Sequence, residues 1–91
     1  MPVYLRTNGY KIYFWSNEKG EPIHFHITKG NPDDNDTKIW VLSNGSLKIA
    51  HNKGRIPEND LARIFSAIQN YYFDFIQFWK NYFGEDVKFY E

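Results

Sequence analysis

The stretch Glu21-Pro22-Ile23-His24-Phe25-His26-Ile27 decides the fold of this chain, because polar and apolar side chains alternate through its second half. Alternation with a period of two is typical of a β-strand that has one buried face. His24 and His26 would then lie on one face of a sheet, and the three apolar residues around them on the other. The sequence therefore predicts a sheet with one covered face and one face that holds two histidines.

Further strand-forming runs lie on both sides of this stretch. Residues 10–15 are rich in β-formers and are followed by the polar turn 16–20, which predicts a hairpin with the histidine strand. Residues 37–42 form a third strand after an acidic loop, and residues 47–50 and 3–5 are candidates for two short ones. We expect an antiparallel sheet of three to five strands.

Residues 56–84 are predicted to form one long helix of about 25 residues, since their apolar residues recur at steps of three and four. Pro57 suits the first helical position and Gly84 suits the C-terminal stop, whereas Ile56 is a weak cap. The 91 residues are thus expected to form a single α+β domain. It would consist of a strand-rich half (1–52), a C-terminal helix packed on one face of the sheet, and a tail (85–91).

Aromatic residues make up 20% of the chain, and more than half of them lie in its second half. The helix is apolar over too wide an arc for a sheet on one side only. Four side chains lie beside or outside its main apolar stripe: Tyr71, Phe73, Phe78 and Tyr82. We therefore expect a homo-oligomer, or a partner protein, to cover them.

Composition limits the classes of function. Eleven basic residues balance eleven acidic ones, which counts against broad, non-specific nucleic-acid binding but leaves room for a local basic patch. The chain has no cysteine, and neither a signal-peptide pattern nor an apolar run long enough to span a membrane. We expect a cytoplasmic protein that does not bind membranes.

The two histidines are candidates for acid–base chemistry. Their Cα atoms would be about 6–7 Å apart in a strand, and histidine titrates near neutral pH. RNA cleavage by 2′-OH attack needs a base, an acid and a cation on the phosphate. Glu18 or Glu21 is placed to orient an imidazole. The candidate phosphate-binding cations are Arg6, Lys11 and Arg55.

Two other interpretations of the pair remain open. Both histidines could simply bond to neighbours on an exposed sheet face. The second interpretation is a metal site with two histidines and one carboxylate, which Glu18 or Glu21 would supply. The only further histidine, His51, is expected in a solvated loop and is not counted as a ligand. We expect no stably bound metal and no other cofactor.

Several motifs together resemble the short bacterial proteins of the domain-of-unknown-function 4160 family. The most specific part is residues 16–26, with Ser16-Asn17-Glu18 and Glu21-Pro22-x-His24-x-His26. The likeness extends over residues 2–6, the strands around Tyr10 and Trp40, the Pro57-Glu58 helix start and the Trp-x-x-x-Phe-Gly ending at 79–84. The chain departs from the family pattern at the acidic loop 31–36, at Ile56 and in the tail after Gly84.

The resemblance implies a small α+β fold and no settled activity. Members are often encoded beside small partner proteins in toxin–antitoxin-like pairs. The first hypothesis is therefore a toxin-like component that acts on RNA through His24 and His26 without a metal. The second is a non-catalytic interaction module, an antitoxin or partner-binding protein, whose aromatic helix binds a cognate small partner.

Overall fold

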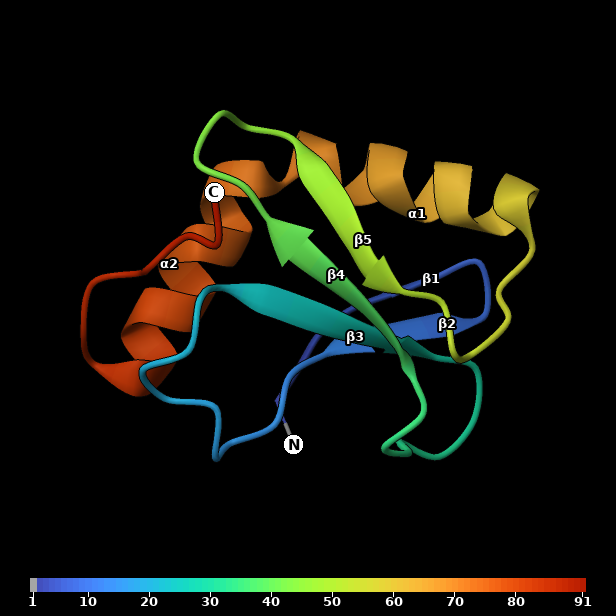
Figure 1. The fold of residues 1–91 in the computed structure, drawn as a ribbon, viewed down its shortest axis with the longest axis horizontal. Helices are drawn as coiled ribbons and strands as arrows, with labels where there is room; N and C mark the ends of the chain where they lie inside the picture. The colour runs from blue at the N-terminus through green and yellow to red at the C-terminus, as the bar shows by residue number, and fades with distance from the viewer. Residues whose placement is uncertain (1) are drawn as a thin grey trace.

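A computed structural model describes residues 2–91, in which five strands form one antiparallel sheet. The strands are β1 (Val3–Thr7), β2 (Tyr10–Tyr13), β3 (His24–Thr28), β4 (Thr37–Val41) and β5 (Leu47–His51). Each strand pairs with the next along the chain, in the order β1-β2-β3-β4-β5 (Figure 1). The predicted α+β class and antiparallel sheet are confirmed, at the upper limit of the expected strand number.

The first hairpin shows how local sequence sets strand pairing. Asn8 and Gly9 form its two-residue turn, with φ of 52° and 82°. Positive φ at both central residues belongs to the turn whose twist matches that of paired strands, and Asn-Gly is its favoured sequence. Thr7 consequently pairs with Tyr10 and Arg6 with Lys11.

The prediction of one long helix is wrong, because the helical half is divided in two. Helix α1 (Glu58–Asn70) and helix α2 (Tyr72–Phe83) meet at Tyr71, whose φ and ψ are −113° and 24°. The two helices run in different directions beside the sheet (Figure 1). The Tyr72 hydroxyl donates to the Leu42 carbonyl at 2.6 Å, which fixes the start of α2 at the end of β4. Gly84 ends α2 in the left-handed conformation, as expected.

The bend lets both helices bury their apolar stripes against the same sheet face. Helix α1 buries Leu61, Ile64 and Ile68, and helix α2 buries Phe75, Trp79 and Phe83. The strands and the residues just beside them contribute to this core Tyr10, Ile12, Phe14, Ile23, Phe25, Ile27, Ile39 and Val41. We call this side of the sheet the inner face. Within residues 2–91, neither helix is long and apolar enough to cross a membrane.

The tail crosses the end of the sheet. Ile23 N–H donates to the Lys88 carbonyl at 2.7 Å, and Ser43 N–H donates to the Glu91 carbonyl at 3.0 Å. Residues 88–91 therefore connect the start of β3 with the end of β4, and the C-terminus lies beside the turn between β4 and β5 (Figure 1).

Candidate functional site

The opposite side of the sheet, the outer face, gathers histidines, cations and aromatic rings. Strand pairing and alternation place on it Arg6, Lys11, Tyr13, His24, His26, Lys38, Trp40, Lys48 and His51. Ring contacts agree with this placement, since His26 lies 5.4 Å from Tyr13 and His24 lies 5.6 Å from Trp40, between ring centroids.

Glu18 joins the two histidines of β3. Its Oε2 accepts hydrogen bonds from His24 Nε2 at 2.7 Å and from His26 Nε2 at 2.9 Å. Its Oε1 accepts from the Trp15 N–H at 2.6 Å. The Glu18 N–H donates to the Trp15 carbonyl, so the turn between β2 and β3 holds the carboxylate over the strand. We call Glu18, His24 and His26 the Glu18 cluster.

The two histidines of the cluster differ in access. The His24 side chain is completely buried, although strand alternation places it on the outer face. The Trp79 ring of α2 contacts both Phe14 of the core, at 4.7 Å between centroids, and His24, at 5.2 Å. The expectation that the helix covers only the face opposite the histidines is therefore wrong for His24. The His26 side chain retains 12% exposure. Of these two histidines, only His26 is therefore open to a molecule that binds on the outer face.

Hydrogen bonds define the charge state of the cluster. His24 Nδ1 donates to the Pro22 carbonyl at 2.8 Å, and its Nε2 faces Glu18, so both ring nitrogens meet acceptors. That arrangement is satisfied by an imidazolium opposite a carboxylate. Burial by itself would raise the pKa of Glu18, but hydrogen bonds from His24 and His26 outweigh it and hold the pKa at about 2. Glu18 is thus ionised at neutral pH.

His51 joins the outer face because of a β-bulge. Lys38 pairs with both His26 and His51, and the register between β4 and β5 shifts next to Lys38. Without that shift His51 would share a face with Ile49, which pairs with the core residue Ile39. Burial and the charges of Lys53, Lys38 and His26 lower the pKa of His51. All three histidines of the chain consequently lie on one face of the sheet, with His24 buried beneath other side chains.

The basic and acidic residues of this neutral chain are unevenly distributed over the sheet. The five strands contain Arg6, Lys11, Lys38 and Lys48 but no aspartate or glutamate. The carboxylates nearest the outer face belong to other elements: Glu18 bonds the histidines, Asp36 bonds the Tyr13 hydroxyl and Glu91 pairs with Lys48. The strands of the outer face are therefore basic, and the three carboxylates that reach this face come from the turns and the tail.

The structure distributes the other predicted site residues unevenly. Lys11 stands opposite Thr28, two residues beyond His26, and Arg6 stands opposite Lys11, so both extend the outer face toward β1. Glu21 is exposed, and it is Glu18 that bonds the histidines. Arg55 lies elsewhere, in a hollow that it shares with Tyr10 and Asp60.

The Glu18 cluster also has the donors of a metal site. Three ligand atoms, one each from Glu18, His24 and His26, lie within 4.8 Å of one another. The Pro22 carbonyl orients His24 and the Trp15 N–H orients Glu18, which are second contacts of the kind that metal ligands use. A two-histidine, one-carboxylate set suits a divalent transition metal, which would have to replace the hydrogens that now join these groups.

Sequence reasoning missed Lys38, Trp40 and His51 as parts of the site. The strand pattern of residues 37–42 already placed Lys38 and Trp40 on one face, and that signal was available. The bulge that places His51 on the outer face has no comparable signal in the sequence.

The family model described as Domain of unknown function (DUF4160) matches residues 9–80. The chain belongs to this family. The match includes the Glu18 cluster and both helices except the last residues of α2. A search of the curated proteins and a search of the solved structures gave no match.

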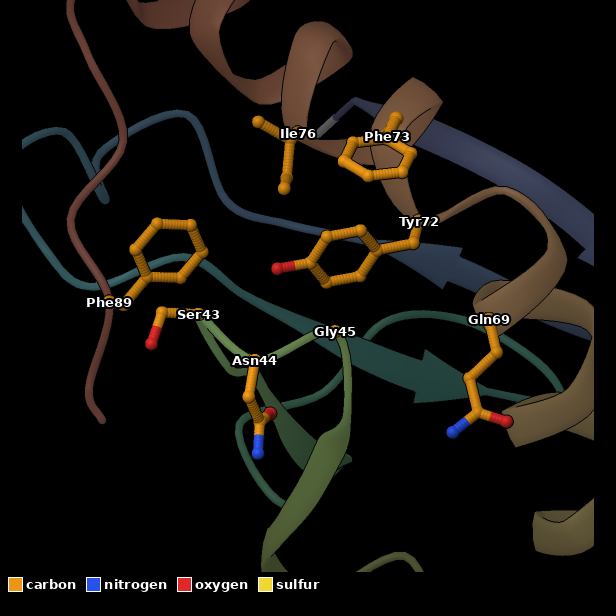
Figure 2. Close-up of a pocket in the computed structure, with 8 residues that line it drawn as sticks. All are labelled: Ser43, Asn44, Gly45, Gln69, Tyr72, Phe73, Ile76 and Phe89. Carbon is orange, nitrogen blue, oxygen red and sulfur yellow. The ribbon is translucent and has the colours of Figure 1, made fainter.

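A separate groove of about 520 Å³ lies away from the histidines. Figure 2 shows its walls, formed by the β4–β5 turn, the start of α2 and the tail. Its lining residues are Ser43, Asn44, Gly45, Gln69, Tyr72, Phe73, Ile76 and Phe89. Phe73 at its rim is 81% exposed, the largest exposure among the big apolar side chains of residues 2–91.

Proposed function

We propose that this protein is a metal-independent endoribonuclease, the toxin-like component of a toxin–antitoxin-type pair, and that RNA binds to its outer face. The observation that supports the proposal is the gathering of all three histidines and four cations on one sheet face whose strands contain no carboxylate. Such a patch attracts a phosphate backbone even though the whole chain is neutral.

In this proposal His26 and His51 transfer protons on either side of one phosphate. They lie on β3 and β5 with Lys38 between them, about 9–10 Å apart at the backbone, since neighbouring strands are about 4.8 Å apart. His26 Nε2 bonds to the Glu18 carboxylate, which fixes the ring and leaves its Nδ1 as the nitrogen that would donate a proton. The lowered pKa of His51 suits it to accept one.

The proposed step is a transesterification without a cofactor. His51 takes the proton of the ribose 2′-OH, whose oxygen forms a bond to phosphorus. The bond from phosphorus to the 5′-oxygen breaks, and His26 gives that oxygen a proton. The products are a 2′,3′-cyclic phosphate and a 5′-hydroxyl. Lys38 stabilises the charge that develops on the phosphate.

The remaining residues position the reacting groups or bind the strand. Glu18 orients His26, and the buried His24 holds Glu18, so we assign both to positioning. Arg6 and Lys11 would bind the RNA backbone farther along the outer face. The places of Glu21 and Arg55 give them no part in this step.

The test uses the purified protein and an unstructured RNA oligonucleotide, with the 2′,3′-cyclic phosphate as the measured product. We expect His26→Ala and His51→Ala each to lower the cleavage rate by about 10²- to 10⁴-fold, the usual contribution of a general acid or base. Lys80→Ala, on the exposed side of α2, is the control for lost positive charge. If both histidine variants melt like the parent and cleave as fast, the proposal is wrong.

One observation favours the second candidate function, a non-catalytic interaction module. Phe73, which lines the groove of Figure 2, is 81% exposed, and Tyr71, two residues before it in the chain, is 48% exposed. Exposed aromatic side chains at a groove are typical of protein interfaces. Suppose that expression slows growth, the histidine variants keep this effect and Tyr71→Ser with Phe73→Ser removes it. Partner binding would then be the function.

A further inference from the structure

Tyr90 and Trp40 form an unusual ring pair at the outer face. Their rings are parallel within 2° and their centroids are 4.6 Å apart. The other aromatic pairs of residues 2–91 are tilted by 35° or more, as is common where rings fill a core. Tyr90 is 52% exposed, so this stack lies on the surface.

Two lysines flank the pair. Lys38 Nζ lies 4.2 Å from the centre of the Trp40 ring, and Lys48 Nζ lies 5.5 Å from the centre of the Tyr90 ring. Lys48 also binds the Glu91 carboxylate at 2.5 Å. The last two residues of the tail thus place a flat ring on Trp40 and an anionic group on Lys48.

Stacking on an exposed indole beside two cations is how proteins hold an unpaired nucleobase and its phosphate. We infer that Trp40, Lys38 and Lys48 form a nucleotide-binding subsite for single-stranded RNA, and that Tyr90 and Glu91 occupy this subsite until RNA displaces them. Trp40 stands opposite His24 in the β3–β4 pairing, so the subsite adjoins the Glu18 cluster. The inference rests on the proposed action on RNA and adds how the RNA is held and how its access is limited.

The contacts that hold the tail are of the kind a ligand can replace. The Tyr90 ring is half exposed, and the ion pair between Lys48 and Glu91 is about half exposed on both sides, at 50% and 54%. Exposed ion pairs contribute little to stability. The backbone hydrogen bonds of Lys88 and Glu91 anchor the tail, so RNA would need to displace only the side chains of Tyr90 and Glu91.

The first experiment measures the affinity of the full chain for a labelled single-stranded oligoadenylate by fluorescence anisotropy. We expect Tyr90→Ala to bind about tenfold more tightly than the parent and Trp40→Ala about tenfold more weakly, as for loss of one stacked base. Tyr82→Ala is the matched control, because Tyr82 is 48% exposed on α2, outside the outer face. Its affinity should equal that of the parent.

The second experiment identifies the ligand class with small probes. Adenosine 5′-monophosphate should compete with the labelled RNA, and ribose 5-phosphate, which lacks the base, should compete at least tenfold less well. Equal competition by the two probes would mean that Lys38 and Lys48 bind phosphate without stacking, and would overturn the subsite.

The outcomes separate this inference from the proposed function. If Tyr90→Ala binds no more tightly than the parent, or gains as much affinity in a chain that also has Trp40→Ala, the subsite is wrong even where His26→Ala abolishes cleavage. If the affinities change as expected but no variant produces a cyclic phosphate, the subsite stands and the cleavage proposal fails. If neither the parent nor Tyr90→Ala binds RNA, both are wrong.

Discussion

The two faces of β3 bury their side chains by different physics. Phe25 and His24 are neighbours in the chain, and both are fully buried. Phe25 packs against Phe75 of α2, with ring centroids 5.5 Å apart, in a core that is entirely apolar around it. His24 lies between Trp40 and Trp79, yet its two ring nitrogens bond to the Pro22 carbonyl and to Glu18.

The difference shows what each face requires from the rest of the chain. Apolar burial is non-directional, so the inner face accepts any well-shaped apolar neighbour. A buried charged ring instead needs specific acceptors, and losing one of them leaves a charge without a partner. Packing on the inner face therefore supplies stability that does not depend on pH. On the outer face, the stability contributed by the Glu18 cluster depends on the ionisation of Glu18, and the same cluster positions His26 for the proposed chemistry.

The largest effect that we predict concerns the inner face. Phe25→Ala should lower the free energy of unfolding by about 3–5 kcal/mol, because it removes a buried aromatic ring and leaves a cavity. Lys38→Ala, on the outer side of the sheet, should change it by less than about 0.5 kcal/mol. Urea denaturation of both variants measures the two values. Comparable losses would mean that the faces do not differ as described.

The next effect concerns Glu18 and pH. The pKa of Glu18 is about 2 in the folded chain, below its ordinary value of 4.5, so the unfolded chain binds more protons between these values. The stabilisation is fully present above pH 4.5 and is lost as the pH falls toward 2. A shift of this size corresponds to about 3 kcal/mol.

Glu18→Gln provides the comparison for this pH dependence. The variant should be less stable than the parent at pH 7, because the amide leaves the buried His24 ring without its carboxylate. Its free energy of unfolding should also fall less steeply between pH 4.5 and 2, which urea denaturation across this range will measure. Parallel curves for parent and variant would contradict the assignment of Glu18 as the ionised centre of the cluster.

Much of the sheet could be predicted because its signals are local. Alternation through residues 23–27 places the histidines and Phe25 on opposite faces, and Asn8-Gly9 sets the first turn. The helix break at Tyr71 could not be predicted from periodicity, since the apolar spacing continues from Ile68 through Tyr72 without interruption. The bend is held by a tertiary contact, the hydrogen bond of Tyr72 to the end of β4.

The site was predictable only in part, for the same physical reason. His24 and His26 follow from the strand period, but the sequence offers both Glu18 and Glu21 as partners. The conformation of the turn before β3 determines that Glu18 is the partner, because the Trp15 N–H donates a hydrogen bond to Glu18 and holds it beside the histidines. His51 joins the site through a bulge, a shift of pairing by one residue that residue types do not reveal.

A smaller effect is expected from zinc. The cluster offers three ligands, and the metal must displace the hydrogens that join Glu18 to both histidines, so we expect a Kd no tighter than about 1 μM. Zinc at ten times that concentration would then stabilise the fold by at most about 1.4 kcal/mol. Calorimetry on protein freed of affinity tags measures the Kd. Sub-micromolar binding that disappears in His24→Ala would make the cluster a metal centre and displace the acid–base role of His26.

The smallest effect on stability is expected at Phe73, which belongs to neither face of the sheet. Phe73→Ser should change the free energy of unfolding by less than about 0.5 kcal/mol, since the side chain is 81% exposed. Phe78, also expected at an interface, instead packs against Tyr4 and Phe14, so its replacement would damage the core. A variant of Phe73 thus tests association without disturbing the fold.

Light scattering measures the consequence for Phe73. We expect the parent to be heavier than one 10.9 kDa chain, and Phe73→Ser to shift it toward the monomer, because a contact between copies would bury this ring. Asp74→Ser, at the next exposed position of α2, should leave the mass unchanged. If the parent stays monomeric at high concentration, Phe73 does not form a contact between copies of this chain. A cognate small partner protein would then be the molecule to test for binding at the groove.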